Sequence, residues 1–256
     1  MDFHFFSISG LLVSAVYFFA GFIDSVCGGG GLVTVPALIA IGIPAHMISG
    51  TNQASTIIGS FSALHLYIRN KKLHLFSALC ALPFSTIGAY FGSNLNMILP
   101  EKSLQIIMLA LVPILAVILV FKKDFGGDNH VDDLSKRQVI VRAVIIGFLL
   151  GLYQGFYGPG SGMLALFAFV FLLKLDMLRS NGTIKFVISA SCIIASINYA
   201  LSGMIIMKIV ILATIFNTIG SRLGVKYALA RGSKGIRPIM FMVIAGLMVK
   251  IVMDLI

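Results

Sequence analysis

The chain has 256 residues, of which 59% are hydrophobic and 11% are charged, and its formal net charge is +10. So much apolar surface cannot be buried in a soluble core of this size, so the composition predicts an all-α polytopic membrane protein. Four of the nine acidic residues fall in one central polar loop, which leaves few carboxylates for acid–base or metal catalysis, and we therefore expect no enzyme, no metal site and no cofactor. The basic residues lie in short loops between apolar runs, a distribution typical of membrane topology and not of nucleic-acid binding.

Apolar runs predict ten helical segments along the chain. They cover residues 5–26, 32–43, 50–68, 74–95, 103–121, 139–157, 163–174, 182–201, 205–228 and 236–256. A helix needs about 20 residues to cross a bilayer. The second and seventh segments are too short, and each directly follows a glycine-rich stretch, so we predict two half-spanning or re-entrant helices.

The polar stretch 122–138 divides the ten segments into five and five. We predict a first repeat over 1–121, a cytoplasmic linker over 122–138 and a second repeat over 139–256. Matching residues support the repeat: Gly21 and Gly28 match Gly151 and Gly158 at an offset of 130, and Thr51 and Gln53 match Thr183 and Lys185 at an offset of 132. An odd number of segments per half requires the two halves to be inverted relative to each other.

The lysines and arginines predict the orientation in the membrane. If every segment reverses direction, fifteen of them fall on one side and three on the other, and Lys185 remains inside the membrane. The positive-inside rule then places both termini outside the cytoplasm.

Two glycine-rich breaks are the strongest candidates for a binding site. Asp24 to Pro36 has the sequence DSVCGGGGLVTVP, and Gln154 to Gly162 has the sequence QGFYGPGSG. A helix that starts after such a break presents free N–H groups and the positive end of its dipole, which suits a small anion. The candidate substrate-binding residues here are Gly28, Gly29, Gly30, Gly31, Gly158, Gly160, Ser161 and Gly162. The alternative is that these glycines only allow close helix packing.

Polar residues near the start of the third segment of each half are further candidates. Thr51, Asn52, Gln53 and Thr183 could bind the substrate, and capping of the helix is an equal alternative for them.

Two charged residues also fall within apolar sequence. Lys185 is expected to be functional because a charge inside a membrane is costly, although its ammonium could instead snorkel to the surface. Asp24, one helical turn before the glycines, could balance Lys185 or carry a proton, so we predict a coupling role.

These residues also carry a family resemblance. GFIDSVCGGGGLVTVPAL at 21–38 followed by GTNQ at 50–53, and GLYQGFYGPGSG at 151–162 followed by GTIK at 182–185, resemble the two repeats of the sulfite exporter TauE/SafE family of membrane anion transporters. The resemblance implies transport of small sulfur-containing or organic anions, such as sulfite or a sulfonate. Gln53 stands where many relatives are expected to have lysine, which leaves Lys185 as the sole cation at the predicted site.

The sequence thus predicts a secondary transporter that moves a small anion by alternating access. An anion channel is the close alternative, and an intramembrane serine hydrolase built on Ser161 is a remote one. The expected partners are the anion, the lipid bilayer and, with the oligomeric state left open, a second copy in a homodimer.

Overall fold

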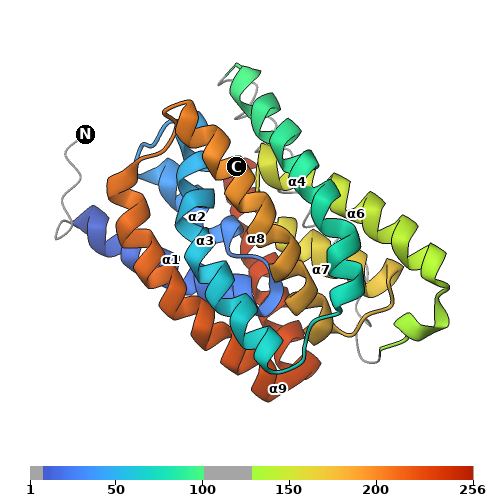
Figure 1. Cartoon of the computed structure of the whole chain (residues 1–256). Helices are drawn as coiled ribbons and strands as arrows, with labels where there is room; N and C mark the ends of the chain where they lie inside the picture. Colours follow the sequence, from blue (N-terminus) through green and yellow to red (C-terminus); the bar gives the residue numbers. More distant parts are fainter. Residues whose placement is uncertain (1–7, 101–128, 256) are drawn as a thin grey trace.

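The computed structural model describes residues 8–100 and 129–255, and this part of the chain is helical with no β-strand (Figure 1). The first half contains α1 (Ile8–Cys27), α2 (Gly31–Ala40), α3 (Ala45–Arg69) and α4 (Leu75–Ile98). The second contains the 3-10 turn η1 (Val131–Asp133), α6 (Lys136–Phe156), α7 (Ser161–Leu172), α8 (Met177–Leu201) and α9 (Met207–Leu255). The predicted fifth segment, 103–121, and the predicted linker up to residue 128 lie outside the described residues.

Five helices are long and apolar enough to cross a membrane. They are Gly10–Cys27, Leu75–Ile98, Lys136–Phe156, Met177–Leu201 and Met207–Arg231. Together with the absence of strands from the described part, they confirm the predicted all-α, multi-pass membrane protein. Helices α2 and α7, with 10 and 12 residues, are as short as the sequence predicts.

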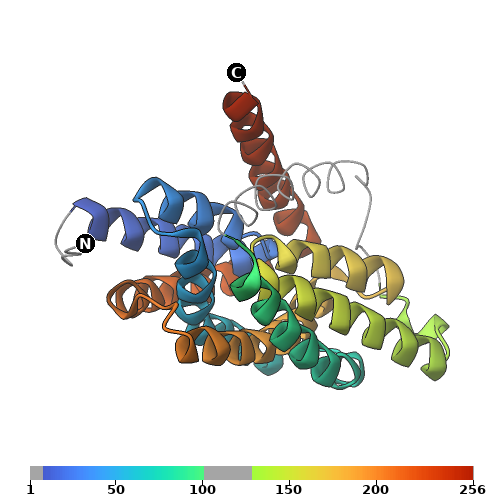
Figure 2. The same cartoon turned by 90° about the horizontal axis from the view of Figure 1, so that it is seen from above.

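The two last predicted segments form one assigned helix, α9, that is broken at Gly232. The backbone there has φ of 58° and ψ of −153°, which is not helical and favours glycine. Figure 2 shows the part of α9 after this break pointing away from the rest of the bundle. The break at Gly232 therefore lies between the predicted segments 205–228 and 236–256, in the polar stretch that separates them.

Glycines bring α4 and α6 into close contact. A Cβ added to Gly151 would lie 2.6 Å from the Cα of Ser85, and one added to Gly155 would lie 2.8 Å from the Cα of Ala89. Such small-residue contacts let membrane helices approach closely. Because the paired residue numbers rise together, α4 and α6 run in the same direction.

Helices α1 and α9 pack in the same way at the other side of the bundle (Figure 1). A Cβ on Gly220 would lie 2.9 Å from the carbonyl carbon of Phe18, and one on Gly224 would lie 3.1 Å from that of Phe22. These two helices also run in the same direction. The glycine contacts of α4 with α6 thus recur between α9 and α1.

Helices α3 and α8 lie between these two pairs and run antiparallel (Figure 1). The Thr51 hydroxyl, near the start of α3, accepts a 3.0 Å hydrogen bond from the N–H of Ile206, which follows α8. The Thr183 hydroxyl, near the start of α8, accepts one of 3.0 Å from the N–H of His74, which follows α3. The start of each central helix therefore lies beside the end of the other.

The outer surface of α9 is apolar. Met207, Ile211, Ile215, Ile219 and Leu223 recur every fourth residue and are 44% to 61% exposed. Residues four apart lie on one face of a helix. This stripe is suited to contact with lipid.

Candidate functional site

The two glycine breaks are in direct backbone contact. Gly28 follows α1 with φ of 79°, and a Cβ added to it would lie 2.5 Å from the Cα of Gly162. A Cβ on Gly31 would lie 2.6 Å from the Cα of Pro159. A side chain at either position would collide with the opposite turn, so the contact itself requires glycine.

Side chains satisfy the carbonyl groups at the end of α1. The Tyr67 hydroxyl donates a 2.8 Å hydrogen bond to the carbonyl oxygen of Ser25, and the Asn181 amide donates one of 2.7 Å to that of Val26. The last carbonyls of a helix have no partner within the helix, and they form the negative end of its dipole. These bonds therefore neutralise the end of α1.

The end of α6 is satisfied in the same way. The Tyr199 hydroxyl donates a 2.8 Å hydrogen bond to the carbonyl oxygen of Gly155, and Gln53 Nε2 donates one of 2.9 Å to that of Gln154. Tyr67 and Tyr199 occupy matching positions in the two halves. Gln53, a predicted substrate-binding residue, thus holds the end of a helix.

The helices that start after the breaks are treated differently. The N-cap residues of α2 and α7 are Gly30 and Gly160, and neither start has a side-chain cap. By contrast, Ser135 caps α6 and Asp176 caps α8, whereas the start of α3 at Pro44 also has no side-chain cap. The positive ends of α2 and α7 are therefore left open toward the space between the breaks.

This space is a cavity of about 30 Å³, which is room for roughly two water molecules. Eight of the predicted residues line it: Asp24, Gly28, Gly30, Gly31, Asn52, Gly158, Gly160 and Ser161. The structure thus brings parts of both breaks and of α3 to one cavity. A four-atom anion would need this cavity to widen.

Six predicted residues do not line the cavity: Gly29, Thr51, Gln53, Gly162, Thr183 and Lys185. Gly29 packs on Ile23 and Val243. The threonines bind the loops that follow α3 and α8, as described above. Binding of a substrate by these six residues remains a prediction.

Sequence reasoning missed several lining residues: Thr34, Thr56, Ser60, Gln154, Cys192 and Asn217. Thr34 and Gln154 lie within the two glycine-rich stretches, whereas Cys192 and Asn217 stand singly in apolar helices, where nothing in the sequence sets them apart. Thr56 and Ser60 are the exception, because their spacing of four places both hydroxyls on one face of α3. That pattern could have marked the face of α3 that turns inward.

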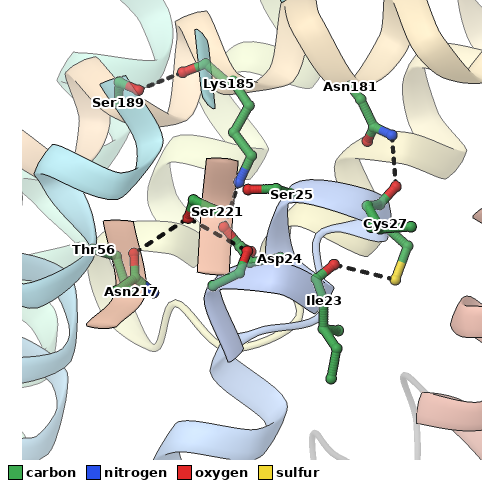
Figure 3. Close-up of polar contacts among 12 residues, drawn as sticks. Ile23, Asp24, Ser25, Cys27, Thr56, Asn181, Lys185, Ser189, Asn217 and Ser221 are labelled. Carbon is green, nitrogen blue, oxygen red and sulfur yellow. Dashed lines mark hydrogen bonds and ion pairs between the residues drawn. The ribbon is translucent and has the colours of Figure 1, made fainter. Parts of the chain in front are cut away.

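Lys185 of α8 forms an ion pair with Asp24 of α1, close to the first break (Figure 3). The lysine side chain is 4% exposed and the aspartate side chain is 26% exposed, on the side of the cavity. A buried charge is tolerated when an opposite charge accompanies it. In this arrangement, the positive charge of Lys185 is balanced by Asp24 and is not directed at the cavity.

The polar groups on the cavity wall are oriented by hydrogen bonds. Asn52 Oδ1 accepts hydrogen bonds from the Thr34 hydroxyl at 2.7 Å and from the Tyr17 hydroxyl at 3.3 Å, which leaves its NH₂ group as a donor. Ser161 donates to the side-chain oxygen of Gln154. No histidine lines the cavity in the described part of the chain, so Ser161 has no base of the kind that a serine hydrolase uses.

Apolar spans around a polar cavity between two broken helices define the class of multi-pass membrane transporters. Comparison of the sequence with known families agrees, because the profile of the sulfite exporter TauE/SafE family matches residues 13–251. The chain belongs to this family.

Similar proteins cover nearly the whole chain. The "probable membrane transporter protein ORF9" of Sinorhizobium sp is 32% identical over 99% of this chain and 95% of its own length. The "probable membrane transporter protein YfcA" of Escherichia coli K12 is 29% identical, over 97% of this chain and 93% of its own length. No solved structure matches the chain. The expected membrane transporter is therefore confirmed at the level of the family.

Proposed function

We propose that this protein is a secondary transporter that binds a small anion between the two glycine breaks. One observation carries the proposal: the negative ends of α1 and α6 are neutralised by side chains, whereas the positive starts of α2 and α7 have no cap. The N–H groups of Leu32 and Val33 donate to the carbonyls of Gly29 and Gly30, and that of Ser161 donates to Gly158, so part of each first turn is left for a ligand. The start of a helix, with the positive end of its dipole, is a ready-made anion site. The cavity between them therefore favours negative charge.

The size and donors of the site favour a compact oxyanion. Asn52 offers an NH₂ group, and the Ser161 hydroxyl can turn from Gln154 toward a ligand. Sulfite, a sulfonate or a short carboxylate presents several acceptor oxygens on one small group. Such a ligand can accept hydrogen bonds from both helix starts at once.

Matching contacts support an inverted repeat over 1–121 and 139–256, joined by a cytoplasmic linker at 122–138. Ile206 matches His74 in the repeat, and Thr51 matches Thr183. The hydrogen bond from Ile206 to Thr51 is therefore the counterpart of the one from His74 to Thr183. Since α3 and α8 are antiparallel, the halves have opposite orientations in the membrane. Rocking of one half against the other would then open the site to either side in turn, with both termini outside the cytoplasm of a bacterial inner membrane.

Asp24 is proposed to couple transport to a second ion. Its carboxylate lines the cavity and also holds Lys185, so any change at Asp24 alters the charge beside the anion site. Replacement of Asp24 by asparagine is expected to uncouple the anion flux from its driving ion.

Counterflow in liposomes tests the transporter against the anion channel. With the membrane potential clamped at zero, liposomes that contain the protein and unlabelled sulfite should accumulate labelled sulfite transiently, because a carrier exchanges substrate, whereas a channel concentrates the label only when a diffusion potential drives it. Asn52→Ala should abolish this signal. Asn198→Ala is the matched control, since Asn198 donates to Ser93 away from the cavity. Sulfite flux without counterflow would favour the channel.

A further inference from the structure

The walls of the cavity differ in their chemistry. The wall built by α1, α3 and α9 carries oxygen-bearing side chains, namely Asp24, Thr56, Ser60 and Asn217. At the matching positions of the repeat stand Gln154, Ile188 and Cys192 in the second half and Ser85 in the first. Oxygen atoms therefore gather on one wall, around the single carboxylate.

We propose that Asp24, Thr56, Ser60 and Asn217 form a sodium site, and that sodium bound there releases Lys185 to the transported anion. The second part of this inference rests on the proposed function. The first part does not, because a cation site can be tested without any anion substrate.

Contacts place Asn217 between α1 and α3. A Cβ added to Gly21 would lie 3.1 Å from the Cα of Asn217, and one added to Gly59 would lie 3.1 Å from its Cγ. Gly21 lies one turn before Asp24, and Gly59 lies between Thr56 and Ser60. The Asn217 amide therefore faces Gly59 of α3, and Asn217 lines the same cavity as Asp24, Thr56 and Ser60.

The hydrogen bonds leave oxygen lone pairs for a cation. The Thr56 hydroxyl donates its proton to the carbonyl oxygen of Gln53 at 3.0 Å, so it can act as a ligand. Asn217 Oδ1 accepts only a long hydrogen bond of 3.5 Å, from Ser221. Figure 3 shows Asp24 with Lys185 on one side and with Asn217, Ser221 and Thr56 on the other.

The ligand set indicates a hard monovalent cation. Carboxylate, amide and hydroxyl oxygens are ligands of hard cations. One carboxylate supplies one negative charge, which balances one sodium ion and leaves a divalent ion under-neutralised. The described residues contain no group of three His, Cys, Asp or Glu that would hold a transition metal.

Sodium and Lys185 compete for the same carboxylate. When sodium binds Asp24, the ammonium loses its partner inside the protein, where an unpaired charge is costly. The nearest new partner for the Lys185 ammonium is an anion bound at the open starts of α2 and α7. Sodium and the anion then bind together, and with a monovalent anion such as hydrogen sulfite or a sulfonate the occupied site is neutral overall.

Thermal unfolding of the detergent-solubilised protein tests the sodium site. Sodium chloride should raise the Tm above its value in choline chloride of equal ionic strength, and the shift should saturate as the site fills. Ser60→Ala and Asn217→Ala should lose this shift. Ser85→Ala, at the position that matches Asn217, should keep it. Equal Tm values in the two salts, or a sodium shift that persists in Asp24→Asn, would overturn the inference.

Addition of sulfite separates the two proposals. We expect sodium to increase sulfite affinity about tenfold in the wild type, and to have no effect on that affinity in Asp24→Asn. If sulfite binds equally well with and without sodium, the anion site stands and the inference fails. If sodium stabilises the protein and no anion does, the sodium site stands and the proposed function fails. A stabilisation that follows pH and ignores sodium would assign Asp24 to a proton instead, and would also overturn the sodium site.

Discussion

The two halves of the molecule use the same contact at the glycine breaks with different chemistry. In the first half the Asp24 side chain binds Lys185, and at the matching place in the second half the Gln154 carbonyl oxygen accepts a hydrogen bond from Gln53. The neutral contact is a hydrogen bond of 2.9 Å. A buried ion pair is weak grounds for stability. We therefore propose that the ion pair serves transport and that the fold could do without it.

The largest expected effect comes from a substitution at the contact between the two glycine breaks, which involves both halves. Gly28→Ala places a methyl group against the Cα of Gly162 and also forces an alanine into a left-handed conformation. Overpacking and backbone strain together should cost about 3 kcal/mol or more of unfolding free energy. Gly162→Ala should cost less, because the overpacking acts there alone. Thermal unfolding in detergent measures both.

Gly246→Ala is the matched control for these two variants. Among the residues that the structure describes, nothing lies within 4 Å of a Cβ at Gly246, so its Tm should stay close to that of the wild type. If Gly28→Ala unfolds at the same temperature as this control, the two breaks are not in the contact described.

The second prediction concerns replacement of the ion pair in the first half by neutral side chains, so that it resembles the second half. Lys185→Gln leaves the Asp24 carboxylate without its partner and should cost up to about 3 kcal/mol of stability. The double variant Asp24→Asn, Lys185→Gln should recover most of this loss, because no charge is left unpaired. Sulfite counterflow should be abolished in both the single and the double variant. A double variant that transports like the wild type would show that the ion pair has no functional role.

The third prediction sharpens the comparison at the two buried tyrosines. Tyr67→Phe removes the hydrogen bond to the Ser25 carbonyl, and Tyr199→Phe removes the one to Gly155. An unsatisfied buried polar group costs about 1–3 kcal/mol. Tyr199→Phe should cost less, since the Gly155 carbonyl also accepts a 3.4 Å hydrogen bond from Gln53. Equal Tm shifts for the two variants would contradict this ranking.

The smallest effect concerns the loops that precede α4 and α9, where His74 matches Ile206. Burial, together with the positive charge of Arg179, holds the pKa of His74 below its usual value. The folded state thus disfavours protonated His74, so this stabilisation is present above the ordinary histidine pKa of about 6.5 and is lost as the pH falls. Tm should decline more steeply between neutral and mildly acidic pH in the wild type than in His74→Asn. Parallel pH profiles would remove His74 as the cause.

The sequence predicted the features that depend on glycine and on apolar length. Gly28 and Gly158 interrupt the helices where four glycines or a proline-glycine pair make the break unavoidable, and α2 and α7 are short for that reason. It did not predict which polar side chains would face the cavity. Thr34 and Cys192 reach it only because of how α2 and α8 are rotated, which depends on packing between distant segments. Gln53 was expected at the ligand, but its amide binds the end of α6.

The central claim is that a small anion binds at the two open helix starts between the breaks. Thermal unfolding of the purified protein with sulfite, sulfate, thiosulfate, sulfonates and short carboxylates tests it most directly, since a ligand of the folded state raises the Tm with its occupancy. The account predicts a saturable rise with at least one of these anions, lost in Asn52→Ala and kept in Asn198→Ala. Two results would contradict it: no stabilisation by any anion in sodium chloride or in choline chloride, or a rise in Tm that is unchanged in Asn52→Ala.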